Sequence, residues 1–178
     1  MPTLSIEFLE KIFLEQKENS LQGKWITYKD LENLFIKYQS KFKISQIGTS
    51  EENRPINQLK IGTGSKKILL WSQMHGNEST GTKALFDLFN CILNSSEVVF
   101  NKILEECTLV FIPMLNPDGS KAYTRVNANN IDLNRDAVDR VAKESKLLRS
   151  VLEEFEPQFC FNLHDQRTIF GVEGTTNP

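Results

Sequence analysis

The first forty residues alternate between apolar and polar positions at the spacing of helices. Residues 4–16 have apolar side chains at positions 6, 8, 9, 12, 13 and 14, which is the pattern of an amphipathic helix. Thr27 is a suitable N-cap for a second helix over residues 28–38, whose apolar residues share one face. We predict one domain over residues 1–178, and we interpret residues 1–27 as an N-terminal helical extension packed on it.

From residue 42 onward the pattern changes to that of strands alternating with helices. The predicted strands cover residues 42–47, 56–61, 67–74, 108–114 and 158–163. The predicted helices between and after them cover residues 79–93, 98–104 and 137–155. The first two strands are joined by a short turn, whereas the later ones need crossover helices. This order predicts an α/β fold with a mixed parallel and antiparallel sheet flanked by helices.

Composition narrows the classes of protein that the chain can represent. Its 178 residues are 39% hydrophobic and 25% charged, with a net charge of −2. These values are ordinary for a folded domain, and the charge favours neither a nucleic acid nor an anionic membrane as partner. No run approaches the ~18 apolar residues of a membrane span, and the N-terminus does not have the pattern of a secretory signal.

The three cysteines, Cys91, Cys107 and Cys160, are odd in number and lie in apolar surroundings. We therefore interpret them as buried free thiols, which are typical of a reducing compartment. The expected location is cytoplasmic, with a secreted or periplasmic location as the alternative if a signal has been removed.

The candidate chemistry centres on the only two histidines, His75 and His164. Each follows a predicted buried strand, at the edge of an α/β sheet where ligands usually bind. Glu78 lies three residues after His75, where the next helix is predicted to begin. Two imidazoles and a carboxylate are a zinc-ligand set of hydrolytic sites. A histidine and a glutamate at this spacing also occur often by chance, so the neighbouring motifs decide the interpretation.

Four further motifs appear in a fixed order around these residues. Asn53-Arg54-Pro55-Ile56 precedes His75, Asn116-Pro117-Asp118-Gly119 follows the next strand, and Arg125 and the pair Asn134-Arg135 come after that. Together with the histidines, this order resembles the zinc carboxypeptidase (metallocarboxypeptidase) family over about residues 28–174, the N-terminal portion of its catalytic domain.

The resemblance implies a role for each of these residues. They are His75, Glu78 and His164 as ligands of Zn²⁺, Arg125 as the group that polarises the scissile carbonyl, and Asn134 with Arg135 as the clamp for the substrate's free carboxylate. A guanidinium can bind a carboxylate through two parallel hydrogen bonds, which suits such a clamp. The Asn116–Gly119 segment is a strong turn former, which we interpret as scaffold for the loop with Arg125, and Asp132 is interpreted as orienting the clamp.

The sequence departs from the family in one respect. In the family the sheet continues beyond the third zinc ligand, and the general base comes from that later part, for which this chain has no match. We therefore expect a fragment that is inactive alone, with a naturally short relative as the alternative. A sheet cut at this point would expose a strand edge through which copies could self-associate.

The expected function is hydrolytic removal of C-terminal amino acids from peptides by a zinc-dependent metallocarboxypeptidase. The expected substrate is a peptide or amino-acid conjugate with a free carboxylate. Two alternatives remain open at this point. One is a zinc amidohydrolase that acts on N-acyl amino acids, and the other is a non-catalytic relative that binds metal or carboxylate.

Overall fold

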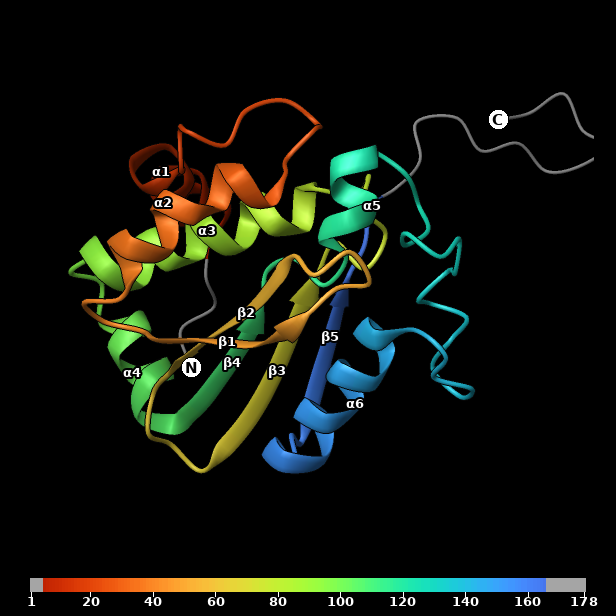
Figure 1. Ribbon diagram of the computed structural model, residues 1–178. Helices are drawn as coiled ribbons and strands as arrows, with labels where there is room; N and C mark the ends of the chain where they lie inside the picture. The colour runs from red at the N-terminus through yellow and green to blue at the C-terminus, as the bar shows by residue number, and fades with distance from the viewer. Residues whose placement is uncertain (1–4, 166–178) are drawn as a thin grey trace, which may run out of the picture.

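The computed structural model of the protein describes residues 5–165, in which six helices and five strands are found (Figure 1). The helices are α1 (Ile6–Gln16), α2 (Tyr28–Tyr38), α3 (Thr80–Asn94), α4 (Val98–Glu106), α5 (Pro117–Ala122) and α6 (Lys143–Phe155). The strands are β1 (Lys43–Thr49), β2 (Pro55–Ile61), β3 (Lys66–Ser72), β4 (Cys107–Ile112) and β5 (Phe159–Leu163). Residues 166–174, the end of the resemblance drawn above, lie outside the described residues.

The five strands form one mixed sheet in the order β1-β2-β4-β3-β5. β1 pairs with β2 and β2 with β4 in antiparallel fashion, while β3 pairs in parallel with both β4 and β5. The predicted hairpin beside parallel crossover strands is thereby confirmed. Because the parallel strands β4, β3 and β5 all point the same way, their C-terminal ends meet at one edge of the sheet, beside α5 in Figure 1.

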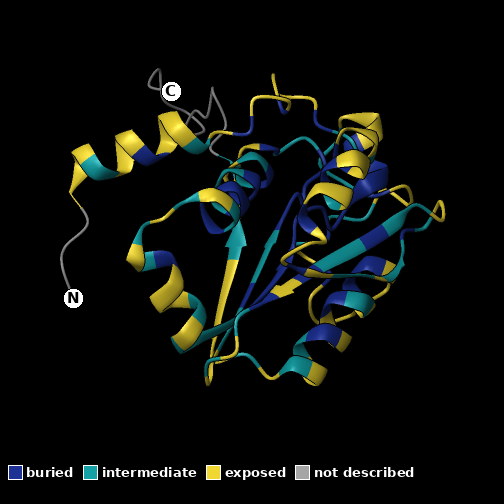
Figure 2. Cartoon of the chain, turned by 90° about the vertical axis from the view of Figure 1, so that its left-hand side faces the viewer, coloured by how far each residue is buried: buried dark blue, intermediate teal, exposed yellow. Residues whose placement is uncertain are grey.

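Helices cover both faces of this sheet, and the side chains of β4 show how the two cores are divided. Leu109 and Phe111 face a cluster built with α1, α2, α3 and α4, whereas Val110 and Ile112 face a second cluster built with α6. Successive residues of a strand point to opposite faces, so an unbroken apolar run is what a two-sided core requires. Figure 2 shows the buried residues concentrated between these layers, while α1, next to the N-terminus, is mainly exposed. In residues 5–165 we find no helix with the length and apolar character that a membrane span needs.

Capping explains why α2 begins where the sequence predicts. The backbone N–H of Thr27 donates to the carboxylate of Asp30 at 2.7 Å, and the backbone N–H of Asp30 donates to the Thr27 carbonyl at 3.0 Å. This reciprocal pair satisfies donors that the first turn of a helix leaves free. The helix begins at Tyr28, as expected.

Helix α5 was not predicted, because its sequence has the composition of a turn. The side chain of Asn116 accepts from the backbone N–H of Gly119 at 2.8 Å, and Pro117 occupies the first helical position. Both features favour the start of a helix as well as a turn. Tyr123 then ends the helix in the left-handed conformation, with a φ of 54°.

The predicted start of the last helix, at residue 137, is wrong by six residues. α6 begins at Lys143, and the carboxylate of Asp136 accepts from the backbone N–H groups of Val141 and Ala142 at 2.8 and 2.9 Å. Arg140, with a φ of 52°, breaks the helical path in between. The carboxylate of Asp136 thus holds the segment before α6, beside isolated backbone bonds such as that from the Arg140 N–H to the Asp136 carbonyl at 2.9 Å.

β5 lies at one edge of the sheet and is more exposed than predicted. Phe159 and Phe161 are 57% and 50% exposed, and Cys160 between them is exposed as well. All three cysteines are free, but only Cys91 is buried and Cys107 is partly covered. The expectation that all three thiols are buried is thus wrong for Cys160, because its strand lacks a neighbour on one side within residues 5–165.

Candidate metal centre

The parallel pairing of β3 with β5 brings the two histidines together. Ser72 at the end of β3 is in register with Leu163 at the end of β5. His164 follows Leu163 directly, and His75 follows Ser72 by three residues in the connection to α3. Residues separated by 89 positions in the sequence therefore meet at the same edge of the sheet.

His75, Glu78 and His164 form a compact group. Nδ1 of His75 lies 2.9 Å from Oε1 of Glu78, and Nδ1 of His164 lies 2.8 Å from Oε2 of the same carboxylate. The centroids of the two imidazole rings are 4.7 Å apart, and one ligand atom from each of the three residues falls within 4.8 Å of the others. Both histidines thus direct the same ring nitrogen toward a common point next to Glu78.

The three side chains of the group differ in how far they are exposed to solvent. His164 is 32% exposed, Glu78 12% and His75 2%. Burial raises the pKa of Glu78, but hydrogen bonds with His164 and His75 outweigh it and hold that pKa below its usual range. Glu78 is therefore a carboxylate at neutral pH, which is the form that a metal ligand needs.

Asp132 supports His75 from the side opposite Glu78. Its Oδ1 lies 3.1 Å from Nε2 of His75, and the same oxygen accepts from the backbone N–H of Asn134 at 2.9 Å. A proton on Nε2 shared with Asp132 leaves the lone pair of Nδ1 free for a metal ion, and such carboxylate support is common at metal-binding histidines. Asp132 was interpreted only as orienting the Asn134-Arg135 pair, so its contact with His75 was missed.

Arg125 lies against the same group. Its Nε donates to Oδ2 of Asp132 at 3.0 Å and its Nη1 to Oε1 of Glu78 at 3.3 Å. Burial raises the pKa of Asp132, but the guanidinium of Arg125 and the imidazole of His75 more than offset this and lower it. With 29% of its side chain exposed, Arg125 borders the metal group and remains accessible to a ligand.

Asn134 and Arg135 lie on the β5 side of the group. Oδ1 of Asn134 accepts from the Asn162 amide on β5 at 3.5 Å, and Arg135 donates to the Asn134 carbonyl at 3.4 Å. Arg135 is exposed, and among the described residues no acidic side chain forms an ion pair with it. Its guanidinium is thus available to an external carboxylate.

The loop between β3 and α3 is packed backbone against backbone on α5. A Cβ atom added to Gly76 would lie 1.9 Å from the carbonyl carbon of Gly119 and 2.1 Å from the nitrogen of Ser120. Only glycine fits so close an approach. The backbone N–H of Asn77 also donates to the carbonyl of Thr124 at 3.2 Å. α5 therefore connects the ligand-bearing loop to the segment with Arg125.

Asp118 anchors α5 to the β1–β2 turn. Its carboxylate accepts from the hydroxyl of Ser50 at 2.7 Å and the backbone N–H of Glu52 at 3.0 Å, and it pairs with Arg54. It is 4% exposed and forms no contact with the metal group in the hydrogen bonds of residues 5–165. These contacts agree with its interpretation as scaffold and not as a catalytic acid.

For Asp165, which directly follows His164, the sequence left a structural role and a contact beside the ligands or substrate as equal alternatives. Its carboxylate accepts from the backbone N–H and the hydroxyl of Thr80, both at 3.0 Å, and its own N–H donates to Oε2 of Glu78 at 3.2 Å. It caps α3 and fastens the end of β5 to the start of that helix. Its position directly after His164 suggested a role of this kind but not the contact with Thr80.

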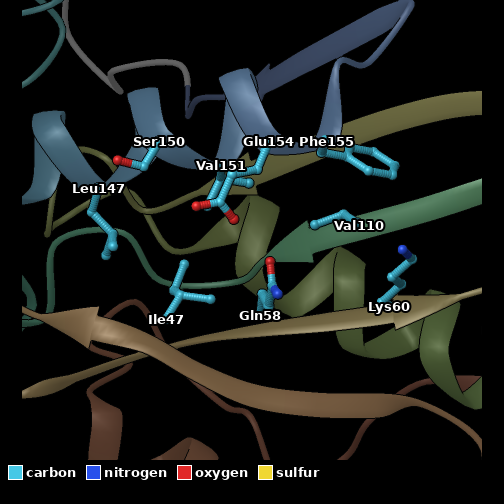
Figure 3. A pocket seen from close by; sticks show the side chains of 9 residues that line it. All are labelled: Ile47, Gln58, Lys60, Val110, Leu147, Ser150, Val151, Glu154 and Phe155. Atoms are coloured by element: carbon cyan, nitrogen blue, oxygen red, sulfur yellow. The ribbon is translucent and has the colours of Figure 1, made fainter.

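A separate hollow lies between α6 and the sheet (Figure 3). It has a volume of about 330 Å³, and its lining comes from β1, β2, β4 and α6, including Ile47, Lys60, Val110 and Glu154. The lining includes no histidine and none of the residues of the metal group. The candidate chemistry therefore lies at the sheet edge and not in this hollow.

Comparisons with known proteins agree with this geometry. A sequence profile of the zinc carboxypeptidase family matches residues 27–160. Probable carboxypeptidase 2 of Trichophyton verrucosum is 28% identical over 103 residues, covering 57% of this chain and 20% of that protein. Carboxypeptidase SOL1 of Arabidopsis thaliana is 33% identical over 128 residues, covering 65% of this chain and 26% of that protein.

Among solved structures, a metallo-carboxypeptidase from Burkholderia cenocepacia superposes with a TM-score of 0.74 at 21% identity. The alignment covers 79% of this chain and 41% of the other. At 21% identity it shows that the two chains share a fold. The chain spans about a fifth of the length of the first of these curated relatives.

Proposed function

The chain belongs to the zinc carboxypeptidase family, and on that premise we propose that it is part of a zinc-dependent metallocarboxypeptidase that removes C-terminal amino acids from peptides. One observation carries the proposal. His75, Glu78 and His164, far apart in the sequence, form a group that fits a metal ion, and Arg125 borders it. Because the chain spans only part of its relatives, the activity and substrate belong to the proposal.

The donor set suits zinc. Two imidazole nitrogens and one carboxylate are the ligands of many catalytic zinc sites, in which a fourth position is left for water or substrate. His75 is oriented by Asp132, and Glu78 is kept ionised by its neighbours. When bound at such a site, zinc supplies a Lewis acid for the carbonyl and a water of pKa ~7.

The remaining side chains divide the work of binding and polarisation. Asn134 and the exposed Arg135 would bind the free carboxylate of the peptide, and a planar guanidinium matches that group well. Arg125, adjacent to Glu78, would donate to the carbonyl oxygen as negative charge develops on it. We propose that the general base comes from residues outside this chain, since no residue in it matches the family's base.

The proposal can be tested with the complete protein, its zinc content and paired peptides. Peptides that differ only in a free or an amidated C-terminus should separate sharply, because an amide removes the charge that Arg135 would bind. We expect hydrolysis of the peptide with the free C-terminus and at least a ~100-fold lower kcat/KM for the amidated peptide. A factor of this size corresponds to the free energy lost with a charge-assisted pair of hydrogen bonds. Preferential hydrolysis of N-acyl amino acids would favour the amidohydrolase, and equal hydrolysis of both peptides would exclude a carboxylate clamp.

We also propose that the 178-residue chain on its own self-associates through β5. The edge of this strand is unpaired within residues 5–165, and Phe159 and Phe161 are half exposed. Unpaired edges with apolar side chains favour pairing with another strand, and lysine on such an edge opposes it. Sedimentation equilibrium should show association that Phe161→Lys weakens, while Ile36→Lys on α2 does not. A monomer at all concentrations would refute the proposal.

A further inference from the structure

Two exposed aromatic side chains lie side by side near the metal group and have no part in the site described above. Trp25 is 61% exposed and Tyr123 42% exposed, with ring centroids 6.2 Å apart and planes tilted by 58°. Trp25 precedes residues 27–160, the part of the chain that matches the family profile. Single exposed apolar residues are common, so the position of this pair decides its meaning.

The backbone on both sides of Trp25 is bonded to the loop that carries His75 and Glu78. The hydroxyl of Ser79 donates to the Lys24 carbonyl at 2.6 Å, and Nε2 of Gln73 donates to the Ile26 carbonyl at 2.9 Å. Ser79 directly follows the glutamate ligand, and Gln73 precedes the first histidine by two residues. The connection between α1 and α2 runs toward α5 in Figure 1, where these contacts occur.

Tyr123 is next in the chain to a residue that is bonded to the same loop. The carbonyl of its neighbour Thr124 accepts from the backbone N–H of Asn77, which lies between the two ligands. The next residue in the chain is Arg125, which contacts Glu78. The residues that flank each ring of the aromatic pair are therefore bonded to the loop that carries the ligands.

The order of the strands separates the carboxylate clamp from the aromatic pair. Asn134 contacts Asn162 of β5, whereas Tyr123 follows α5, which comes directly after β4. β3, which leads to the ligand loop, lies between β4 and β5 in the sheet. A peptide with its carboxylate at the clamp and its scissile bond at the metal group would thus extend its upstream residues toward the aromatic pair.

The indole N–H of Trp25 already has a hydrogen-bond partner within the protein, which restricts the chemistry of a ligand that its ring can bind. Its Nε1–H donates to the carbonyl of Ser120 at 2.9 Å, so the exposed part of the indole offers apolar surface. Tyr123 is held at its position by the left-handed end of α5. A tilted pair of this kind accommodates an apolar or aromatic side chain, since aromatic rings favour edge-to-face and offset contacts.

We propose that Trp25 and Tyr123 form a substrate subsite for an apolar or aromatic side chain on the N-terminal side of the cleaved bond. The subsite rests on the proposed carboxypeptidase function and adds to it a preference for longer peptides. It is supplied in part by the N-terminal extension, outside the part of the chain that matches the family.

The test compares substrates of different length on the complete, zinc-loaded protein. The substrates are a blocked dipeptide and a hexapeptide with the same two C-terminal residues and phenylalanine upstream. We expect Trp25→Ala to lower the ratio of kcat/KM between hexapeptide and dipeptide about tenfold through KM, the factor that corresponds to ~1.4 kcal/mol. Tyr123→Asn, which tolerates the left-handed conformation, should lower it in the same direction.

Two controls separate ring contact from structural support. Trp25→Phe keeps an aromatic ring but loses the bond to Ser120, so it should retain most of the ratio, and Phe13→Ala on α1 should leave it unchanged. A ratio unaffected by Trp25→Ala, or equal losses in both Trp25 variants, would each overturn the subsite. If the dipeptide is hydrolysed while the ratio does not move, only the subsite fails. If neither substrate is hydrolysed, the proposed function fails first and the subsite with it.

Discussion

Replacement of His75 by alanine is expected to abolish stoichiometric zinc binding by the complete protein. The substitution removes a ligand that is 2% exposed and leaves Glu78 and His164 to hold the ion. Removal of an outer partner of a metal ligand already costs ~10–100-fold in affinity, so the loss of the ligand itself should exceed that range. Metal analysis after gel filtration, together with competition against a chelator, would measure the effect.

Asp132→Asn is the matched control for this variant. The amide keeps the size of Asp132 and leaves all three ligands in place, but it weakens the support of Nε2 of His75. We expect a moderate loss of zinc affinity within ~10–100-fold, with full occupancy restored at high zinc concentration. Unchanged zinc content in His75→Ala would remove His75 from the ligand set and with it the basis of the proposed function.

Thermal or urea unfolding distinguishes loss of zinc from loss of fold. Zinc that binds only the native state should raise the free energy of unfolding of the wild-type protein by ~2.7 kcal/mol at a concentration 100 times Kd. His75→Ala should show no such increase, although its metal-free stability can be compared directly with that of the metal-free wild type. A zinc-dependent increase of equal size in both proteins would contradict the assignment.

Most of the fold followed from the sequence because β3 and β4 contain apolar runs, β1 and β2 mix apolar with polar residues between turn signals, and the long helices have clear apolar stripes. α5 and the start of α6 did not, since both depend on side chains that cap backbone groups. A six-residue helix beginning with Asn116 and Pro117 has the composition of a turn. The delayed start of α6 depends on the carboxylate of Asp136, which the apolar pattern does not record.

The same distinction applies to the candidate site. The short spacing of His75 and Glu78 and the position of His164 after a strand were sufficient to suggest a metal group, because parallel strands end at a common edge. The contacts of Asp132 with His75 and of Asp165 with Thr80 depend on the path of loops. Trp25 gave no signal in the sequence, because its position next to α5 depends on a hydrogen bond between residues 95 positions apart.

Arg125→Ala is expected to have the largest effect on turnover in a protein that still holds its metal. In the structure Arg125 directs its guanidinium to Glu78 and Asp132, at the border of the metal group. Loss of one donor to a developing oxyanion typically lowers kcat by ~10²–10³. We expect a decrease in kcat of this size with a small change in KM, measured on the complete protein with a free-carboxylate peptide.

Arg135→Ala should have the opposite kinetic signature, which makes the pair of variants more informative than either alone. Arg135 is exposed and lacks an acidic partner among residues 5–165, so its removal takes away a contact to substrate and leaves the metal group intact. An interaction made equally in the bound and transition states raises KM when lost, by ~10–100-fold for a charged hydrogen-bond pair.

Zinc content must be measured alongside, because Arg125 also balances the charges of Glu78 and Asp132. If Arg125→Ala lost zinc, its fall in kcat would reflect support of the ligands and not polarisation of the carbonyl. If the two variants exchanged their kinetic effects at full zinc occupancy, the clamp would lie at Arg125 and the assigned roles would be reversed.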